Sequence, residues 1–223
     1  MTIISRQYLS IPIVILLAAN IFPLYGVLEL GWGVFELIFL FWMENVVIGL
    51  FNIFKLLTSR PHNAVLWLGK LFFVPFFAVH YGMFTLVHGV FVIALFGPEP
   101  LKELLSDSMD SLGAIIDLPL ENSLAVAAAL LAVSHAVSFY FDYIRNDEYE
   151  RAGLQQLMSE PYRRVVVLHV GLIASGFLLM SLDQPTTGLI LLIFLKIGLD
   201  VTGLLKRERS IDDKCQRDTD EDG

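Results

Sequence analysis

The chain is poor in cysteine and in charge, and each shortage argues against a class of protein. Its 223 residues include one cysteine, Cys215, so no disulfide can form within the chain, and no cysteine-based zinc or haem-attachment motif exists. Charged residues make up 17% of the sequence, whereas a soluble domain has about 25%. The net charge of −8, without a basic face studded with aromatic residues, disfavours a nucleic acid as partner.

The motifs of nucleotide and serine chemistry are also missing. The sequence has no glycine-rich phosphate loop and no Gly-x-Ser-x-Gly run. Ser134 and His135 are neighbours, so on a helix their side chains point about 100° apart and cannot act together as nucleophile and base. The sequence therefore disfavours an intramembrane serine protease.

Apolar residues are abundant. They make up 56% of the chain, the mean hydropathy is +0.67, and a helix that spans a bilayer needs about 20 mostly apolar residues. The third apolar stretch begins near Ala64 if Trp67 and Lys70 lie at the membrane interface. Six stretches qualify: residues 11–28, 33–57, 71–96, 124–143, 165–182 and 188–205. The sequence predicts an all-α polytopic bundle in the lipid bilayer, with residues 11–28 retained because no clear signal-cleavage site is present.

The distribution of lysine and arginine predicts the orientation of this bundle. The odd-numbered connections carry one basic residue, Lys102, and eight acidic ones, whereas the even-numbered connections and both ends are basic. Cytoplasmic loops carry the excess of basic residues. We therefore expect a multi-pass protein of the cell membrane with both termini in the cytoplasm. The deciding residues are Arg6, Lys55, Arg60, Lys70, Arg145, Arg151, Arg163, Arg164, Lys206, Arg207 and Arg209.

Two segments lie outside the predicted spans. Residues 97–122 repeat leucine and isoleucine at helical spacing with acids between them, which predicts an amphipathic helix on the outer interface. That helix either fills a long connection or covers an outward opening. Residues 211–223 are acidic and poor in apolar residues, which predicts a disordered cytoplasmic tail after a membrane domain of residues 1–210.

Ionisable residues inside the apolar stretches predict a polar centre, because charge in hydrocarbon is costly and points to function. Converted to depth at 1.5 Å per residue, Glu44 and His135 lie within about 2 Å of their span midpoints. His80, His169 and Asp200 lie roughly 5–7 Å toward the cytoplasm. The centre also includes His88, on the outer side, Lys196 and Asn45.

Three imidazoles and two carboxylates at one depth favour a divalent metal such as zinc, which binds both kinds of ligand. We expect His80, His135, His169 and Asp200 as ligands, with Asn45, Thr85 and other nearby polar groups as outer acceptors. Metal-bound water becomes a nucleophile near neutral pH, and Glu44 would be its general base. The pattern indicates a metal-dependent intramembrane hydrolase acting on a lipid or another membrane-resident substrate.

Other interpretations use the same residues. Each histidine alone can be an interhelical hydrogen-bonding group. Lys196 and Asp200 stand one turn apart and can neutralise each other, and with Glu44 they would form the proton relay of a proton-coupled transporter. A b-type haem can lie between His80 and His169. His80 and His88, however, lie about 12 Å and about 80° apart on one helix and cannot share a metal.

Five segments carry a resemblance to a known family: residues 41–50, 80–89, 134–139 and 161–169, and the Lys196-x-x-x-Asp200 spacing. Together they resemble a prokaryotic multi-pass membrane family classed only as a domain of unknown function. The resemblance covers most of the chain except the tail and implies a six-span architecture. More distantly, the histidine and aspartate content is similar to integral-membrane zinc hydrolases of the alkaline ceramidase type, which have seven helices and another motif order.

Overall fold

The computed structural model describes residues 21–61, 63–99, 101–103, 122–162 and 165–166, together with 190, 193–194 and 197–198. Within these residues the secondary structure is helical, and no strand occurs. The elements are α2 (Val34–Thr58), α3 (Ala64–Phe96), α6 (Asn122–Ser138), the π-helix η1 (Phe139–Ile144) and α7 (Glu148–Arg151). Residues 21–29 and 154–162 are also helical.

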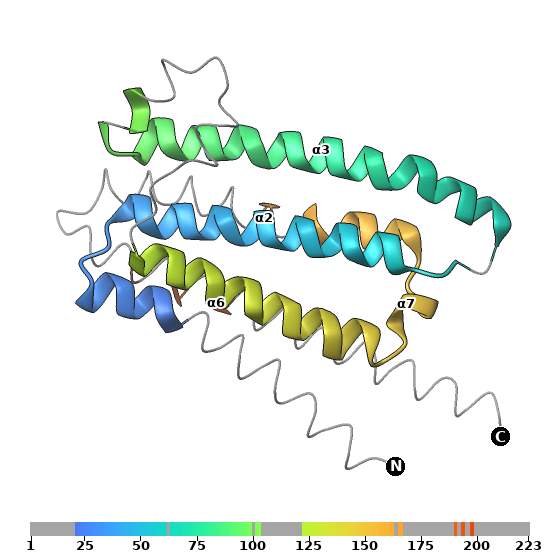
Figure 1. Ribbon diagram of the computed structural model, residues 1–223. Coiled ribbons are helices and arrows are strands. Elements are labelled where there is room, and N and C mark those ends of the chain that lie inside the picture. The colour runs from blue at the N-terminus through green and yellow to red at the C-terminus, as the bar shows by residue number, and fades with distance from the viewer. Residues whose placement is uncertain are drawn as a thin grey trace, which may run out of the picture.

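Helix α2 lies between its two long neighbours. Figure 1 shows α3 running antiparallel to α2 on one side, while α6 runs beside the other side in the same direction as α2. Trp32, just before α2, donates from Nε1 to Ser123 Oγ at 3.2 Å, which ties the beginning of α2 to that of α6. Helix α2 therefore packs against α3 on one face and against α6 on another.

Three described helices are long and apolar enough to cross a bilayer: Val34–Thr58, Ala64–Phe96 and Ser123–Ile144. These match the second, third and fourth predicted spans, and the third begins at Ala64. The protein is an all-helical membrane protein in the residues that the structure describes. Most of the first, fifth and sixth predicted spans, residues 104–121 of the interfacial helix, and the tail lie outside these residues, so six spans and cytoplasmic termini stay predictions.

Local signals in the sequence set the ends of α2 and α3. Gly31 has a φ of +70°, which suits glycine, and the Gly33 N–H donates to Glu36 Oε2 at 2.8 Å to begin α2. The Asn63 side chain accepts from the Val65 N–H at 2.8 Å and begins α3. The short link between the two helices makes them an antiparallel pair.

Two aromatic side chains lie against glycines where α2 and α3 pack. The Tyr81 ring covers Gly49 and the Trp42 ring covers Gly89, each so closely that a Cβ on the glycine would overlap the ring. The same rings make hydrogen bonds between the helices, from Trp42 Nε1 to Thr85 O at 2.7 Å and from Tyr81 Oη to Asn45 O at 3.0 Å. Small residues at such positions let membrane helices approach closely.

Candidate polar centre

Glu44 of α2 and His135 of α6 face each other inside the helix layer. Glu44 Oε1 lies 3.8 Å from His135 Nε2, and the two side chains are 5% and 13% exposed. Both residues lie within about 3 Å of the midpoints of their helical spans, measured along the helix axis. The structure thus brings together two of the residues that the sequence placed at one depth.

The His135 ring lies in an apolar setting, and its Nε2 atom makes no hydrogen bond within the described part of the chain. Phe51 lies beside the imidazole, with ring centroids 6.5 Å apart. Nε2 is buried and has no hydrogen-bond partner in the part of the chain that the structure describes. The 3.8 Å to Glu44 Oε1 exceeds the length of a hydrogen bond. This geometry leaves Nε2 available to a further ligand.

His80 lies away from the Glu44–His135 pair. It is exposed on α3, where its ring stacks on Phe76 at 5.4 Å and lies 6.0 Å from the Tyr162 ring. Because α2 lies between α3 and α6, the structure does not bring His80 to the Glu44–His135 pair. Its predicted role as a metal ligand stays a prediction.

His169, Lys196 and Asp200 lie outside the described residues, so the roles predicted for them, including the haem site with His80, stay predictions. Within the ranges that are described, no group of three or more histidine, cysteine, aspartate or glutamate side chains could hold a metal ion. Among the described residues of the predicted centre, Glu44 and His135 are a histidine and a carboxylate that the structure brings within 3.8 Å of each other.

Asn45 and His88 belong to the contact between α2 and α3, together with Thr85. The Asn45 amide donates from Nδ2 to Phe41 O at 2.8 Å, and His88 Nδ1 donates to Phe84 O at 2.7 Å. Asn45, Thr85 and His88 are 6%, 7% and 6% exposed. We name this buried row, Asn45, Thr85 and His88, the polar seam. It lies on the opposite side of α2 from α6.

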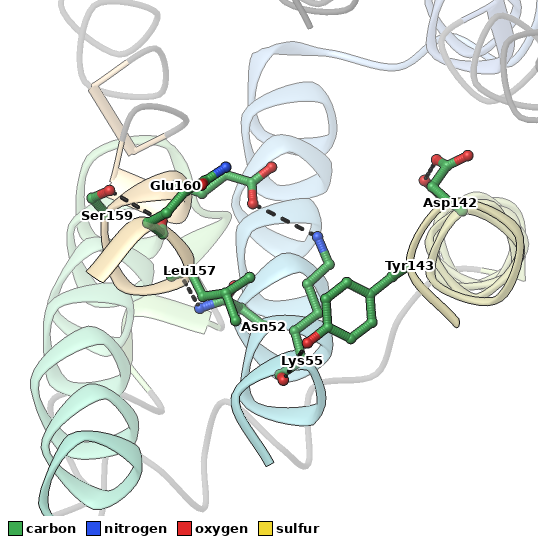
Figure 2. A network of polar contacts seen from close by, with 9 residues as sticks. Asn52, Lys55, Asp142, Tyr143, Leu157, Ser159 and Glu160 are labelled. Carbon is green, nitrogen blue, oxygen red and sulfur yellow. Dashed lines mark hydrogen bonds and ion pairs between the residues drawn. The ribbon is translucent and has the colours of Figure 1, made fainter. Parts of the chain in front are cut away.

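A second polar network, shown in Figure 2, lies near the C-terminal end of α2. Asn52 Nδ2 donates to Leu157 O at 2.9 Å, and Lys55 Nζ lies 3.7 Å from Glu160 Oε2. Tyr143 Oη donates to Lys55 O at 2.7 Å. Sequence reasoning missed this network, although Asn52 is a polar residue inside an apolar run and offered a signal. It ties α2 to η1 and to helical residues 154–162.

The π-helix sets which α6 side chains reach α2. The Arg145 N–H bonds to Tyr140 O at 2.9 Å, five residues back, so η1 turns less per residue than an α-helix. On a regular α-helix, His135 and Tyr143 would point about 80° apart. With the wider turn between them, both contact α2, at Glu44 and at Lys55.

Comparison with known proteins adds one match. No curated protein and no solved structure matches the chain. The sequence model of DUF6498, described as a family of unknown function, matches residues 2–217. Since that match covers nearly the whole sequence, the chain belongs to this family.

Proposed function

We propose that the protein is a metal-dependent intramembrane hydrolase centred on His135 and Glu44. The observation that carries the proposal is the buried His135 Nε2, which faces a carboxylate oxygen at 3.8 Å and makes no hydrogen bond in the described structure. An imidazole nitrogen and a carboxylate oxygen, brought together from two helices, are donors that zinc accepts.

The separation of the two atoms suits a bound ion with a water between them. Neighbouring ligands of a tetrahedral zinc lie about 3.4 Å apart when the bonds are about 2.1 Å. If His135 Nε2 held the ion, Glu44 Oε1 would be close enough to accept a proton from a water bound to it. That placement supports the predicted division of labour, in which His135 binds the ion and Glu44 takes the proton of the bound water.

The remaining ligands and the substrate class follow from the sequence. His169 and Asp200 have the donor types that would complete a three-ligand catalytic site with His135. The pair lies near the middle of two candidate spans, at a depth where the bilayer can supply a substrate. We therefore propose a lipid, or another membrane-resident molecule with a hydrolysable bond, as substrate.

Elemental analysis of the purified protein tests the metal. We expect about one zinc or similar ion per wild-type chain, and His135→Ala should weaken metal binding at least ~10-fold because a ligand is lost. Glu44→Gln should keep the ion but lose metal-dependent turnover of a fluorogenic lipid ester. Glu36→Gln is the matched control on α2, since its carboxylate only caps Gly33 and glutamine keeps an acceptor oxygen. Wild-type protein that binds no metal after zinc is supplied would contradict the proposal.

The same contact favours a second candidate, a proton-coupled transporter. Glu44 and His135 join two candidate spans and can share one proton without a net charge in hydrocarbon. A pH jump across proteoliposomes should then drive a transient charge movement that Glu44→Gln abolishes and Glu36→Gln keeps. Metal-free protein with this signal supports the transporter, whereas stoichiometric metal without it supports the hydrolase.

A further inference from the structure

The polar seam contains two buried oxygens that make no hydrogen bond among the described residues. They are Asn45 Oδ1 on α2 and Thr85 Oγ1 on α3, from residues that are 6% and 7% exposed. Buried polar groups in folded proteins are almost always satisfied, by protein or by ordered water. Two such oxygens in one helix contact therefore indicate a missing partner.

A flipped side chain does not explain why these two oxygens lack a hydrogen bond. The Asn45 Nδ2 group donates to Phe41 O, and a backbone carbonyl can only accept, so the amide orientation is fixed and Oδ1 remains as an acceptor. Thr85 uses its carbonyl to accept from Trp42 Nε1, while its hydroxyl stays unused. The missing partner must donate to Asn45, and it can donate to or accept from Thr85.

The two residues lie at the same level of the helix pair. Tyr81 Oη bonds to Asn45 O, and Trp42 Nε1 bonds to Thr85 O, which fixes the antiparallel register of α2 against α3. In this register Asn45 lies opposite the turn from Tyr81 to Thr85. His88, one turn beyond Thr85, continues the buried polar row toward the Phe96 end of α3.

We propose that the polar seam holds water at the level of Asn45 and Thr85, and that this water exchanges with the aqueous solution. A water that bridges Asn45 Oδ1 and Thr85 Oγ1 satisfies both groups, as buried waters do when they have two or more polar partners. The Glu44 carboxylate faces His135 on α6, so water held in the seam lies on another face of α2, about 100° round the helix. The presence of the water does not depend on the proposed hydrolase, because it rests on the two oxygens alone.

Cysteine accessibility tests the seam. Cys215→Ser removes the one native thiol, and Thr85→Cys, His88→Cys and Asn45→Cys are then introduced singly. Met83→Cys and Val87→Cys are matched controls on the same stretch of α3, because these apolar side chains are 58% and 44% exposed on a candidate membrane span. The probe is a small, charged, water-soluble methanethiosulfonate applied to proteoliposomes, and mass spectrometry counts the modified thiols.

We expect the seam thiols to react at least ~10-fold faster than the two controls, because only a hydrated thiol ionises to the reactive thiolate. Seam thiols that react no faster than the controls, in variants that elute as folded protein, would overturn the proposal. Reactive seam thiols in a protein that binds no metal would keep the water and refute only the hydrolase.

Discussion

Lys70 illustrates how one side chain can end a neighbouring helix. Its ammonium donates to Leu57 O at 2.8 Å and to Ser59 O at 2.7 Å, at the C-terminal end of α2. Its Nζ also lies 4.6 Å from the centroid of the Trp67 ring. A cation at a helix C-terminus interacts favourably with the helix dipole and satisfies carbonyls that have no partner within the helix.

We predict that Lys70→Met destabilises the folded protein by about 2–4 kcal/mol, because two charge-assisted hydrogen bonds are lost and the carbonyls stay buried. Lys102→Met is the control, since Lys102 makes an exposed ion pair with Glu99 and should change the stability by less than about 0.5 kcal/mol. Thermal unfolding in detergent measures both. Equal melting temperatures for the two variants would contradict the capping role.

Residue-level predictions from the sequence were strongest for depth and weakest for direction. Depth follows from counting along a helix, and it placed Glu44 level with His135, which the structure brings into contact. The direction in which a side chain points can be predicted only when the helix has a distinct polar face. Helix α3 is apolar nearly all round, so nothing in its sequence showed that His80 lies away from that pair. The cap made by Lys70 depends on the pairing of α2 with α3, which no local pattern encodes.

At the scale of the elements, hydropathy predicted the lengths of the helices well and their internal geometry poorly. The stretches 33–57 and 124–143 differ from Val34–Thr58 and Ser123–Ile144 by a residue at either end. Helix α3 begins before its apolar core. The Asn63 cap starts the helix at that point, and the hydrogen bonds of Lys70 stabilise this charged residue in the second turn. The π-helix has no counterpart in the apolar pattern, since it is accompanied by the tertiary hydrogen bond from Tyr143 to Lys55 O and by a local one from Ser138 to Asp142.

Contact between α2 and α3 depends on Gly89, and a matched pair of glycine substitutions on α3 tests this. Gly89→Ala would place a Cβ in the Trp42 ring, so we predict a destabilisation of about 1–3 kcal/mol and a weaker Trp42–Thr85 hydrogen bond. Gly82→Ala meets nothing within 4 Å and should be neutral or stabilising by up to about 1 kcal/mol. Unfolding temperature and tryptophan fluorescence report the two effects. A Gly82→Ala loss as large as that of Gly89→Ala would show that packing on Trp42 is not the cause.

At the scale of the whole molecule, the length of α3 determines how far apart its two ends lie. Helix α3 has 33 residues and is about 50 Å long, enough to cross the bilayer and both of its interfaces. Arg60 precedes it and Lys102 follows it, and both form exposed ion pairs. The distribution of basic residues predicts that Arg60 lies in the cytoplasm and Lys102 outside.

Sidedness of three thiols tests the predicted topology. In a Cys215→Ser background, we expect an impermeant maleimide to label Lys102→Cys on intact cells and Arg60→Cys only after permeabilisation. The native Cys215 should behave like Arg60→Cys, because four predicted spans separate them and an even number returns the chain to the same side. Labelling of Arg60→Cys and Lys102→Cys from one side would show that α3 does not cross the membrane. Labelling of Cys215 from outside, with the other two as expected, would leave α3 as a span and refute six spans, since only an odd number could then follow Arg60.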